Sequence, residues 1–280
     1  MQTYKLIIGT FFWGKRYINC FVNYCLPALL SDNNIPLVKD IIKIKFIICA
    51  DENDFLEASK SKDMIYLSKY CDIERIDTTK DCNKDYRNLI NIAFKEKSIL
   101  RSISPDIICN DGGLLKSLNK IIEGNRIVII PTGGLRVNDG VSIDSFTSGS
   151  LADCFNKNMH EETKRHFIDS KQYFDKPVMK IRKFIDEIKV NSFFFEPVMI
   201  DLREKSIDFD NIELDLIDDL DSVYVSKNSD DIFEISMTPE SNGSYPNNIY
   251  SEDRLLDHVK GIGCTEINRY LYDKGFSIYA

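Results

Sequence analysis

The chain has 280 residues, of which 43% are hydrophobic, so it can bury the core of one large domain or of one domain with a substantial appendage. Its 36 Lys and Arg residues against 44 Asp and Glu give a formal net charge of -8. That balance disfavours a nucleic-acid partner, because such binding depends on neutralising phosphates. No stretch approaches the roughly 18 apolar residues of a membrane span, and no secretory signal pattern opens the chain. We therefore expect a cytoplasmic protein.

Eight cysteines lie at positions 20, 25, 49, 71, 82, 109, 154 and 264, without a CxxC pair or a paired histidine motif. Disulfide frameworks belong mainly to small secreted domains, so we expect reduced, partly buried thiols and no structural zinc.

Four short apolar runs in the first half of the chain each lead into a polar or glycine-bearing turn. They are YKLIIGT at 4–10, KFIICADEND at 45–54, PDIICNDGG at 105–113 and RIVIIPTGG at 126–134. This layout predicts an α/β fold with buried parallel strands whose carboxyl ends carry the chemistry.

The remaining elements follow from periodicity and from turn residues. In chain order we expect a strand at 4–8, a turn at 9–14, a helix from residue 15 that Pro27 kinks or ends, a strand at 45–49, a long helix at 85–103, a strand at 106–109, a helix at 114–123 and a strand at 126–130. The last three should form a right-handed βαβ unit. A polar stretch at 137–149 is the candidate seam between a first half, 1–140, and a second half, 141–280.

The second half is expected to be a smaller α+β section. Its predicted elements are helices at 161–169 and 176–189, strands at 193–200, 222–225 and 232–237, a loop at 239–248, and short helices at 251–258 and 265–273.

The turn after the third run is the first candidate site. Asn110, Asp111, Gly112 and Gly113 precede an amphipathic helix, where a carboxylate can meet a sugar hydroxyl or a divalent cation and glycine lets a ligand approach the backbone. An Asn or Asp before a helix also serves as an N-cap, so a purely structural role stays open. The turn matches neither GxGxxG nor GxxxxGK[ST], which leaves dinucleotide and Walker-type binding without support.

A second constellation follows the first run. It comprises Thr10, Phe12, Trp13, Lys15 and Arg16. The lone tryptophan lies in a predicted turn, where it can stack on a base or sugar or can simply close the core. The adjacent basic residues can pair with a diphosphate or remain solvated.

Two further strand ends carry polar residues. Asp51 opens an acidic stretch after the second run, which either recognises a ribose or base or is a solvated loop. Gly133, Gly134 and Arg136 follow the fourth run, and the planar guanidinium of Arg136 could bind phosphate.

His160, Glu161 and Glu162 lie in NMHEETKRHF, just before a predicted helix. His160 can act as an acid or base near neutral pH, or it can be a helix-start histidine without a catalytic role. The two histidines are not spaced as in HExxH. One DxD, Asp219 to Asp221, lies in an acidic run that is more typical of a solvated face.

Several segments together resemble a bacterial glycosyltransferase family with a GT-A type nucleotide-binding core. They are GTFFWGKRYINCFVNYCLPALLS at 9–31, PDIICNDGGLL at 105–115, RIVIIPTGGLRV at 126–137, HEETKRHF at 160–167 and DDIFEISMTP at 230–239. The resemblance implies a Rossmann-like sheet in which 1–140 binds a nucleotide sugar and 141–280 faces the acceptor. Asn110 and Asp111 stand where the family has its DxD, so the metal, Mn²⁺ or Mg²⁺ in such enzymes, stays open.

The resemblance further implies transfer of a sugar to a glycan or lipid-linked acceptor in capsule or lipopolysaccharide assembly, at the periphery of the inner membrane. Asp111 would position the donor, Thr10 and Trp13 would belong to the nucleotide pocket, and His160 with Glu161 or Glu162 would lie near the reacting centre. One alternative is a noncatalytic α/β scaffold or binding protein of a glycan-assembly complex. A third interpretation is another enzyme of small phosphorylated metabolites, such as a phosphotransferase, which the absence of a phosphate-loop pattern weakens.

Overall fold

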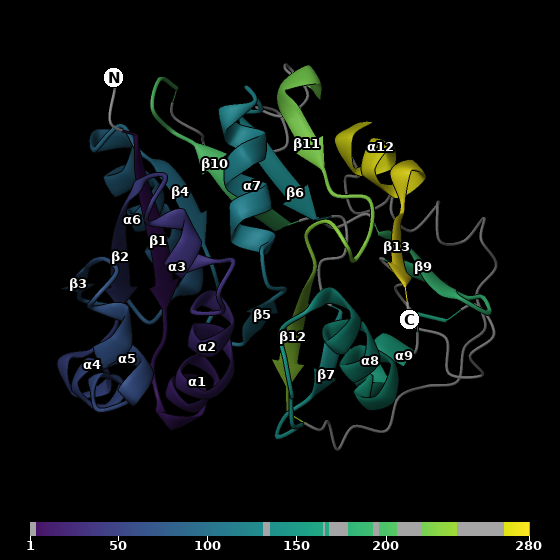
Figure 1. Ribbon diagram of the computed structural model, residues 1–280, viewed down its shortest axis with the longest axis horizontal. Helices are drawn as coiled ribbons and strands as arrows, with labels where there is room; N and C mark the ends of the chain where they lie inside the picture. Colours follow the sequence, from purple (N-terminus) through teal and green to yellow (C-terminus); the bar gives the residue numbers. More distant parts are fainter. Residues whose placement is uncertain are drawn as a thin grey trace. The chain divides into compact units, whose positions relative to one another are not determined.

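The computed structural model describes residues 4–130, 135–164, 166–167, 179–192, 196–205, 220–239 and 266–279 (Figure 1). The chain divides into two compact units. Unit 1 comprises Met1–Val128 and Pro197–Tyr224, and unit 2 comprises Ile129–Glu196 and Val225–Ala280. Among the described residues, no helix is both long enough and apolar enough to cross a membrane.

A seven-stranded sheet with the order β11-β6-β10-β4-β1-β2-β3 organises the fold. Its strands are β1 (Lys5–Phe11), β2 (Lys43–Cys49), β3 (Asp72–Ile76), β4 (Ile99–Ser102), β6 (Ile127–Ile130), β10 (Glu196–Asp201) and β11 (Val223–Val225). β1 pairs in parallel with β2 and β4, β2 pairs in parallel with β3, and β10 runs antiparallel to β4. The predicted α/β class is therefore confirmed.

The order of the four parallel strands indicates where a ligand would bind. The chain builds outward from β1 through β2 to β3 and then returns to place β4 on the other side of β1. The order thus reverses between β1 and β4, and ligands of open α/β sheets bind outside the carboxyl ends of the strands at such a switch point.

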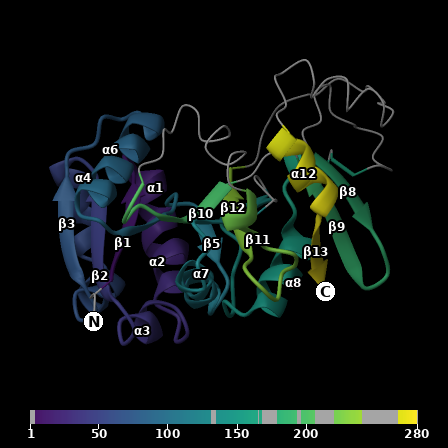
Figure 2. The ribbon, with the colours of Figure 1, turned by 90° about the horizontal axis from the view of Figure 1, so that it is seen from above.

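Helices cover both faces of this part of the sheet (Figure 2). The helices in the described part of unit 1 are α1 (Lys15–Cys20), the π-helical turn η1 (Phe21–Cys25), α2 (Leu26–Leu29), α3 (Ile35–Val38), α4 (Glu52–Ser59), α5 (Lys62–Leu67), α6 (Cys82–Lys95) and α7 (Gly113–Ile122), with a short 3-10 turn η3 (Leu220–Ser222). A Cβ on Gly9 would lie 2.7 Å from the methyl groups of Leu89, so α6 packs against β1 there. On β2, Ile47 is in register with Gly9, so its neighbour Phe46 points to the opposite face of the sheet. The Phe21 ring of η1 lies 6.2 Å from the Phe46 ring, so η1 covers that opposite face.

The helix does not end at Pro27. The helix continues through η1, in which the N–H of Leu26 bonds to the carbonyl of Phe21, five residues back, and Pro27 sits in the first turn of α2. Proline tolerates a first-turn position because it has no N–H to donate, and the wider π turn precedes it.

Two predicted boundaries in unit 1 are wrong. β1 continues through Thr10 and Phe11, so the turn at 9–14 is shorter than predicted. The helix predicted at 85–103 ends at Lys95, and residues 99–102 form β4. Lys97 takes a left-handed φ of 49° while the Ser98 N–H bonds to the Ala93 carbonyl, which is a Schellman ending built without the usual glycine.

The strand of the PDIICNDGG run is also placed differently. β5 (Ile107–Cys109) is not one of the seven strands of the large sheet, although α7 and β6 follow it as predicted. β5 and β6 therefore do not form the expected βαβ unit, and β4 takes the place beside β1.

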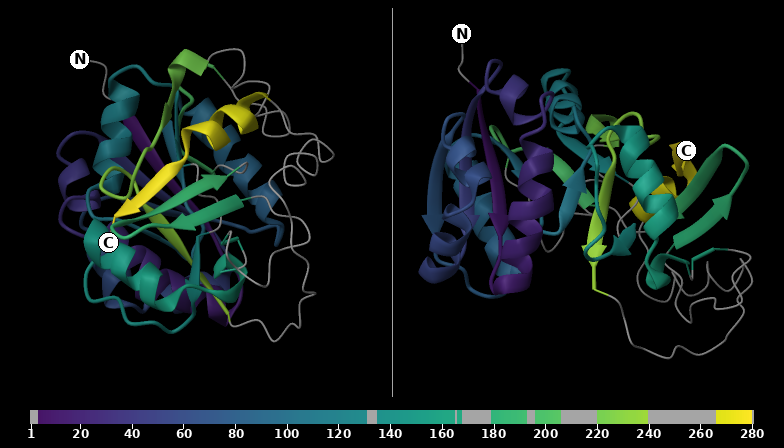
Figure 3. Two further views of the ribbon diagram at one scale, coloured as in Figure 1. Left: turned by 90° about the vertical axis from the view of Figure 1, so that its right-hand side faces the viewer. Right: turned by 60° about the horizontal axis from the view of Figure 1, so that its bottom comes forward.

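Unit 2 contains β7 (Arg136–Asn138) paired in parallel with β12 (Glu234–Thr238), and an antiparallel sheet of β8 (Met179–Lys183), β9 (Glu187–Ser192) and β13 (Phe276–Tyr279) (Figure 3). Among its described residues, the helices are α8 (Ser148–Asn158), α9 (Glu161–Lys164) and α12 (Glu266–Lys274). The predicted helix at 176–189 is wrong, because residues 179–192 form the β8–β9 hairpin. Ile185, an apolar residue of the segment predicted as helical, is 97% exposed at the turn of the hairpin.

The predicted helix at 265–273 and the strands at 222–225 and 232–237 agree with α12, β11 and β12 within a few residues. The expected loop at 239–248 and the helix at 251–258 lie outside the described residues, apart from Pro239. The seven cysteines that are described are free thiols, as predicted, and Cys264 lies outside the described residues.

A carboxylate between two lysines makes the stability of unit 1 depend on pH. Glu96 accepts hydrogen bonds from Lys45 at 2.8 Å and from Lys5. Burial raises the pKa of the Glu96 carboxyl, but these bonds outweigh burial and lower the pKa below its usual range. Its stabilising effect is therefore complete above the unfolded-state pKa of about 4.3 and disappears as the pH falls through the lowered folded-state value.

We accordingly expect Glu96→Gln to lower the free energy of unfolding at neutral pH and to flatten its decline with acidification. Urea unfolding at a series of pH values measures this, with the exposed Glu52→Gln as control. Identical pH profiles for wild type and Glu96→Gln would show that the pair contributes nothing.

Candidate functional site

A pocket of about 310 Å³ lies at the switch point of the sheet, within unit 1. Phe11, Phe12 and Trp13 line it from the end of β1, and Ser104, Pro105 and Asp106 line it from the segment after β4; Tyr17 of α1 and Cys82, the first residue of α6, complete the lining. The pocket therefore has the position that the strand order favours for a ligand.

One wall of the pocket is aromatic. The half-buried Trp13 ring lies 6.3 Å from the ring of Tyr17, and the Arg16 guanidinium lies 4.8 Å from the Tyr17 ring centre. Phe12 is buried and its ring lies 5.2 Å from that of Phe21, so it anchors this wall to the core. A partly exposed indole on such a support can stack on a planar group.

The other predicted members of this constellation lie differently. Thr10 is fully buried in β1 and does not line the pocket, and its hydroxyl has no hydrogen-bond partner among the described residues. Lys15 is exposed at the start of α1. The sequence prediction missed Asp106, the carboxylate that lines the pocket, because residues 99–103 were assigned to a helix and the strand end before Asp106 was hidden.

Asp111 binds a neighbouring loop. Its Oδ1 accepts a hydrogen bond from the Asn33 backbone N–H at 2.9 Å, and its Oδ2 accepts one from the Asn33 side chain at 2.6 Å. Burial raises the pKa of the Asp111 carboxyl, but hydrogen bonds from Asn33 and Ser31 outweigh it and lower the pKa. Asp111 is thus a charged group near neutral pH that holds the loop after α2.

The amino end of α7 is capped by Asn34, a residue from another loop. Gly112, at φ 81°, is the N-cap of α7 and Gly113 its first residue, and a side chain at position 112 would be strained in this left-handed conformation. The Leu114 N–H donates to Oδ1 of the buried Asn34 at 3.0 Å, while Asn34 Nδ2 donates to the Asn110 carbonyl at 3.1 Å. Asn34 therefore joins the loop, the Asn110 turn and α7 in the core.

Asp51, the N-cap of α4, pairs with Lys80 at 2.7 Å. Its side chain and that of Lys80 are largely exposed, so the pair contributes little stability. Neither residue lines the pocket at the switch point.

The candidates after the fourth run gather within unit 2. Arg136 pairs with Glu162, and Glu161 pairs with Lys164 at 2.6 Å. His160 is 1% exposed; its Nδ1 accepts from the Glu162 N–H at 3.2 Å and its Nε2 lies 3.0 Å from the Pro239 carbonyl. These contacts fit a neutral imidazole that donates from Nε2. Gly133 and Gly134 lie outside the described residues.

The described residues contain no evident metal site. In the described ranges, no three side chains of His, Cys, Asp or Glu form a group that could hold a metal ion. Of the DxD, Asp219 lies outside the described residues and Asp221 lies in η3.

No family model matches the chain, and no curated protein matches it. Among solved structures, S. aureus TarS has a TM-score of 0.37 at 12% identity, over 93% of this chain and 39% of its own. TarS 1-349 in complex with UDP has a TM-score of 0.33 at 15% identity, over 51% and 38%. The 4-diphosphocytidyl-2C-methyl-D-erythritol synthase of Anaerococcus prevotii has a TM-score of 0.36 at 11% identity, over 93% and 98%. The chain thus spans less than half the length of the TarS structures.

Proposed function

We propose that this protein is a glycosyltransferase that takes a sugar from a nucleotide-sugar donor, with the nucleotide bound in the pocket at the switch point of unit 1. The observation that carries the proposal is the pocket itself, which joins an aromatic wall to the Asp106 carboxylate at the carboxyl ends of β1 and β4. The sequence resemblance to GT-A type enzymes supports the same assignment. We extend the proposal to a glycan acceptor of bacterial surface polysaccharide assembly.

The lining residues suggest how a nucleotide would be held. Its base would stack on Trp13, since an aromatic ring stacks on any nucleobase, and Asp106 would accept hydrogen bonds from ribose hydroxyls at a strand end. A volume of about 310 Å³ suits a nucleoside and leaves the diphosphate and sugar to extend outside. Sugar transfer would then require a base for the acceptor hydroxyl and groups that stabilise the leaving diphosphate.

A noncatalytic binding protein is the second candidate. This candidate is favoured by the contacts of the four residues that the sequence predicts to be catalytic. Asp111, His160, Glu161 and Glu162 are each engaged by neighbouring protein groups. A binding protein would keep the nucleotide pocket and lack turnover.

Thermal unfolding with UDP-, CMP- and GDP-sugars, each with and without Mn²⁺ or Mg²⁺, tests the donor. A ligand at 100 times its Kd stabilises the folded state by about 2.7 kcal/mol, so one nucleotide class should raise the melting temperature by several degrees. Release of the nucleotide from that donor, followed with acceptor glycans, separates transferase from binding protein. The absence of stabilisation by every nucleotide sugar would contradict both candidates.

A further inference from the structure

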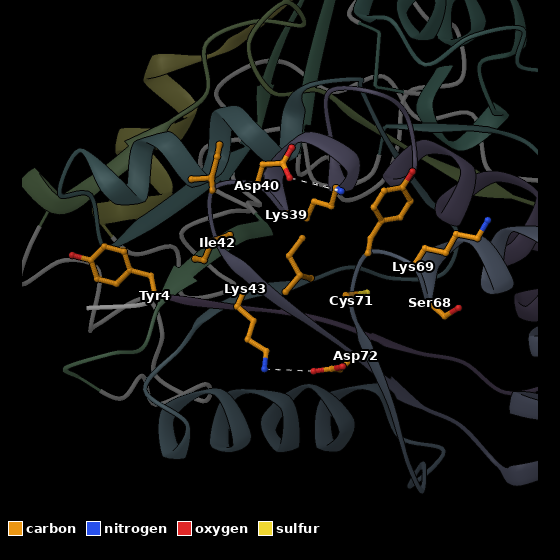
Figure 4. A pocket seen from close by; sticks show the side chains of 12 residues that line it. Tyr4, Lys39, Asp40, Ile42, Lys43, Ser68, Lys69, Cys71 and Asp72 are labelled. Atoms are coloured by element: carbon orange, nitrogen blue, oxygen red, sulfur yellow. Dashed lines mark ion pairs between the residues drawn. The ribbon is translucent and has the colours of Figure 1, made fainter. Parts of the chain in front are cut away.

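A second and larger hollow lies at the opposite edge of the same sheet in unit 1 (Figure 4). It measures about 850 Å³ and is lined by Tyr4 before β1, Lys43 at the start of β2 and Asp72 at the start of β3. It therefore lies at the amino ends of the parallel strands, whereas the candidate nucleotide pocket lies at their carboxyl ends. The two sites share no lining residue.

Three lysines from separate segments line the hollow, and we call this site the lysine hollow. Lys39 follows α3, Lys43 begins β2 and Lys69 follows α5. Two carboxylates accompany them: Asp40 lies 3.7 Å from the Lys39 ammonium, and Asp72 lies 3.6 Å from that of Lys43. The lining thus has one more positive than negative charge, in a chain whose net charge is -8.

The two ion pairs leave donors available to a ligand. Both distances exceed the usual length of an N–H···O hydrogen bond, and the Asp40 and Asp72 side chains are 69% and 77% exposed. Such pairs are weak, so each carboxylate can turn into solvent when another anion approaches. In the described part of the chain, no carboxylate lies within salt-bridge distance of Lys69.

Aromatic rings and apolar side chains complete the hollow. The Lys39 ammonium lies 5.2 Å from the centre of the Tyr70 ring, and Tyr70 packs edge-on against Tyr66 at 4.9 Å. Tyr4 and Ile41 line the same hollow and are 42% and 51% exposed. A ligand here would meet cations together with apolar surface, which suits an anion attached to a carbon skeleton better than an inorganic ion.

We propose that the lysine hollow binds a phosphate ester, with the phosphate between the ammonium groups and the organic part against Tyr4, Ile41 and Tyr70. Lysine binds phosphate as a point charge that needs no fixed geometry, which suits three flexible side chains from different segments. The same chemistry is present in a soluble sugar or polyol phosphate and in the headgroup of an anionic phospholipid.

Two probes distinguish these sources. Calorimetric titration with sn-glycerol 3-phosphate tests the soluble ester, and cosedimentation with phosphatidylcholine vesicles, with and without phosphatidylglycerol, tests the lipid. We expect saturable binding to at least one probe that weakens as the salt concentration rises. Binding of glycerol phosphate identifies a free ester, and binding only to phosphatidylglycerol vesicles identifies the lipid-borne group.

The variant Lys39→Gln, Lys43→Gln, Lys69→Gln removes the charges while keeping long polar side chains, and should weaken binding at least tenfold. The control changes three exposed lysines elsewhere, Lys60, Lys157 and Lys227, to Gln, so that the net charge falls equally. If the triple variant folds poorly, Lys69→Gln alone provides the test. Lys69 has no ion pair with a described carboxylate, and its replacement should also weaken binding. Equal binding by the hollow and control variants, or no binding of either probe to wild type, would overturn the proposal.

Discussion

Replacing Trp13 by Ala is expected to weaken nucleotide binding by roughly tenfold to a hundredfold. Stacking of a base on an aromatic side chain contributes about 1–3 kcal/mol, and about 1.4 kcal/mol corresponds to a factor of ten. Trp13 is half-buried in the aromatic wall of the pocket, so its face can meet a base without opening the core. Trp13→Phe, which keeps an aromatic face, should retain most of the affinity. Calorimetric titration with the donor nucleotide measures both variants.

The control for this prediction is Phe94→Ala. Phe94 is 38% exposed and lies near the last residue of α6, whereas the pocket lies at the first. It should leave the affinity unchanged. If Trp13→Ala binds the nucleotide as tightly as wild type while remaining folded, the base does not stack on this wall.

The largest loss of stability is expected from Asn34→Ala, at roughly 2–3 kcal/mol of unfolding free energy. Asn34 is fully buried, accepts from the Leu114 N–H, and donates to the carbonyls of Ala28 and Asn110. The two carbonyls accept other backbone N–H groups as well, but the Leu114 N–H would be left in the core without its acceptor. A buried donor without a partner costs about 1–3 kcal/mol, to which the other lost bonds add.

Asn33→Ala is the matched control for Asn34→Ala. It removes the side-chain bond to Asp111 at a solvent-exposed position, so we expect a loss of about 1 kcal/mol or less. Urea unfolding measures both variants. Equal losses at the two positions would show that the buried network does not hold the Asn110 turn.

Much of the first half of the fold could be predicted, because its strands are continuous apolar runs that end in turns. β1, β2 and β6 were predicted on this basis, and α7 follows from its amphipathic spacing. β4 was missed because Ile99 and Leu100 also fit the apolar stripe of the helix before them. The helix and β4 are separated by Lys97, which has a left-handed backbone conformation. Lysine is not a residue type that predicts this conformation from sequence.

Hydrophobic pattern also does not reveal which sheet a strand joins. The run that contains β5 has the composition of a buried central strand, yet β5 lies outside the large sheet. In unit 2, the spacing of Ile181, Ile185 and Ile188 fits a helix, but Ile181 and Ile188 face inward from two strands of a hairpin while Ile185 is exposed at its turn.

The candidate site was predicted in part for the same reasons. Trp13 could be identified because an aromatic residue after a buried strand lies at the edge of the sheet. Asp106 could not, because recognising it requires β4 and the strand order. Asp111 bonds to Asn33, 78 positions away, and His160 contacts Pro239, 79 positions away. Contacts between residues so far apart cannot be predicted from one sequence.

Fluorescence of Trp13 reports directly on whether a nucleotide occupies the pocket at the switch point, because Trp13 is the only tryptophan in the chain. Titration with the nucleotide that stabilises the protein should change Trp13 fluorescence saturably, with a midpoint equal to the calorimetric Kd. The change should be abolished by Trp13→Phe while binding persists. Saturable calorimetric binding with unchanged Trp13 emission would show that the nucleotide binds away from this aromatic wall.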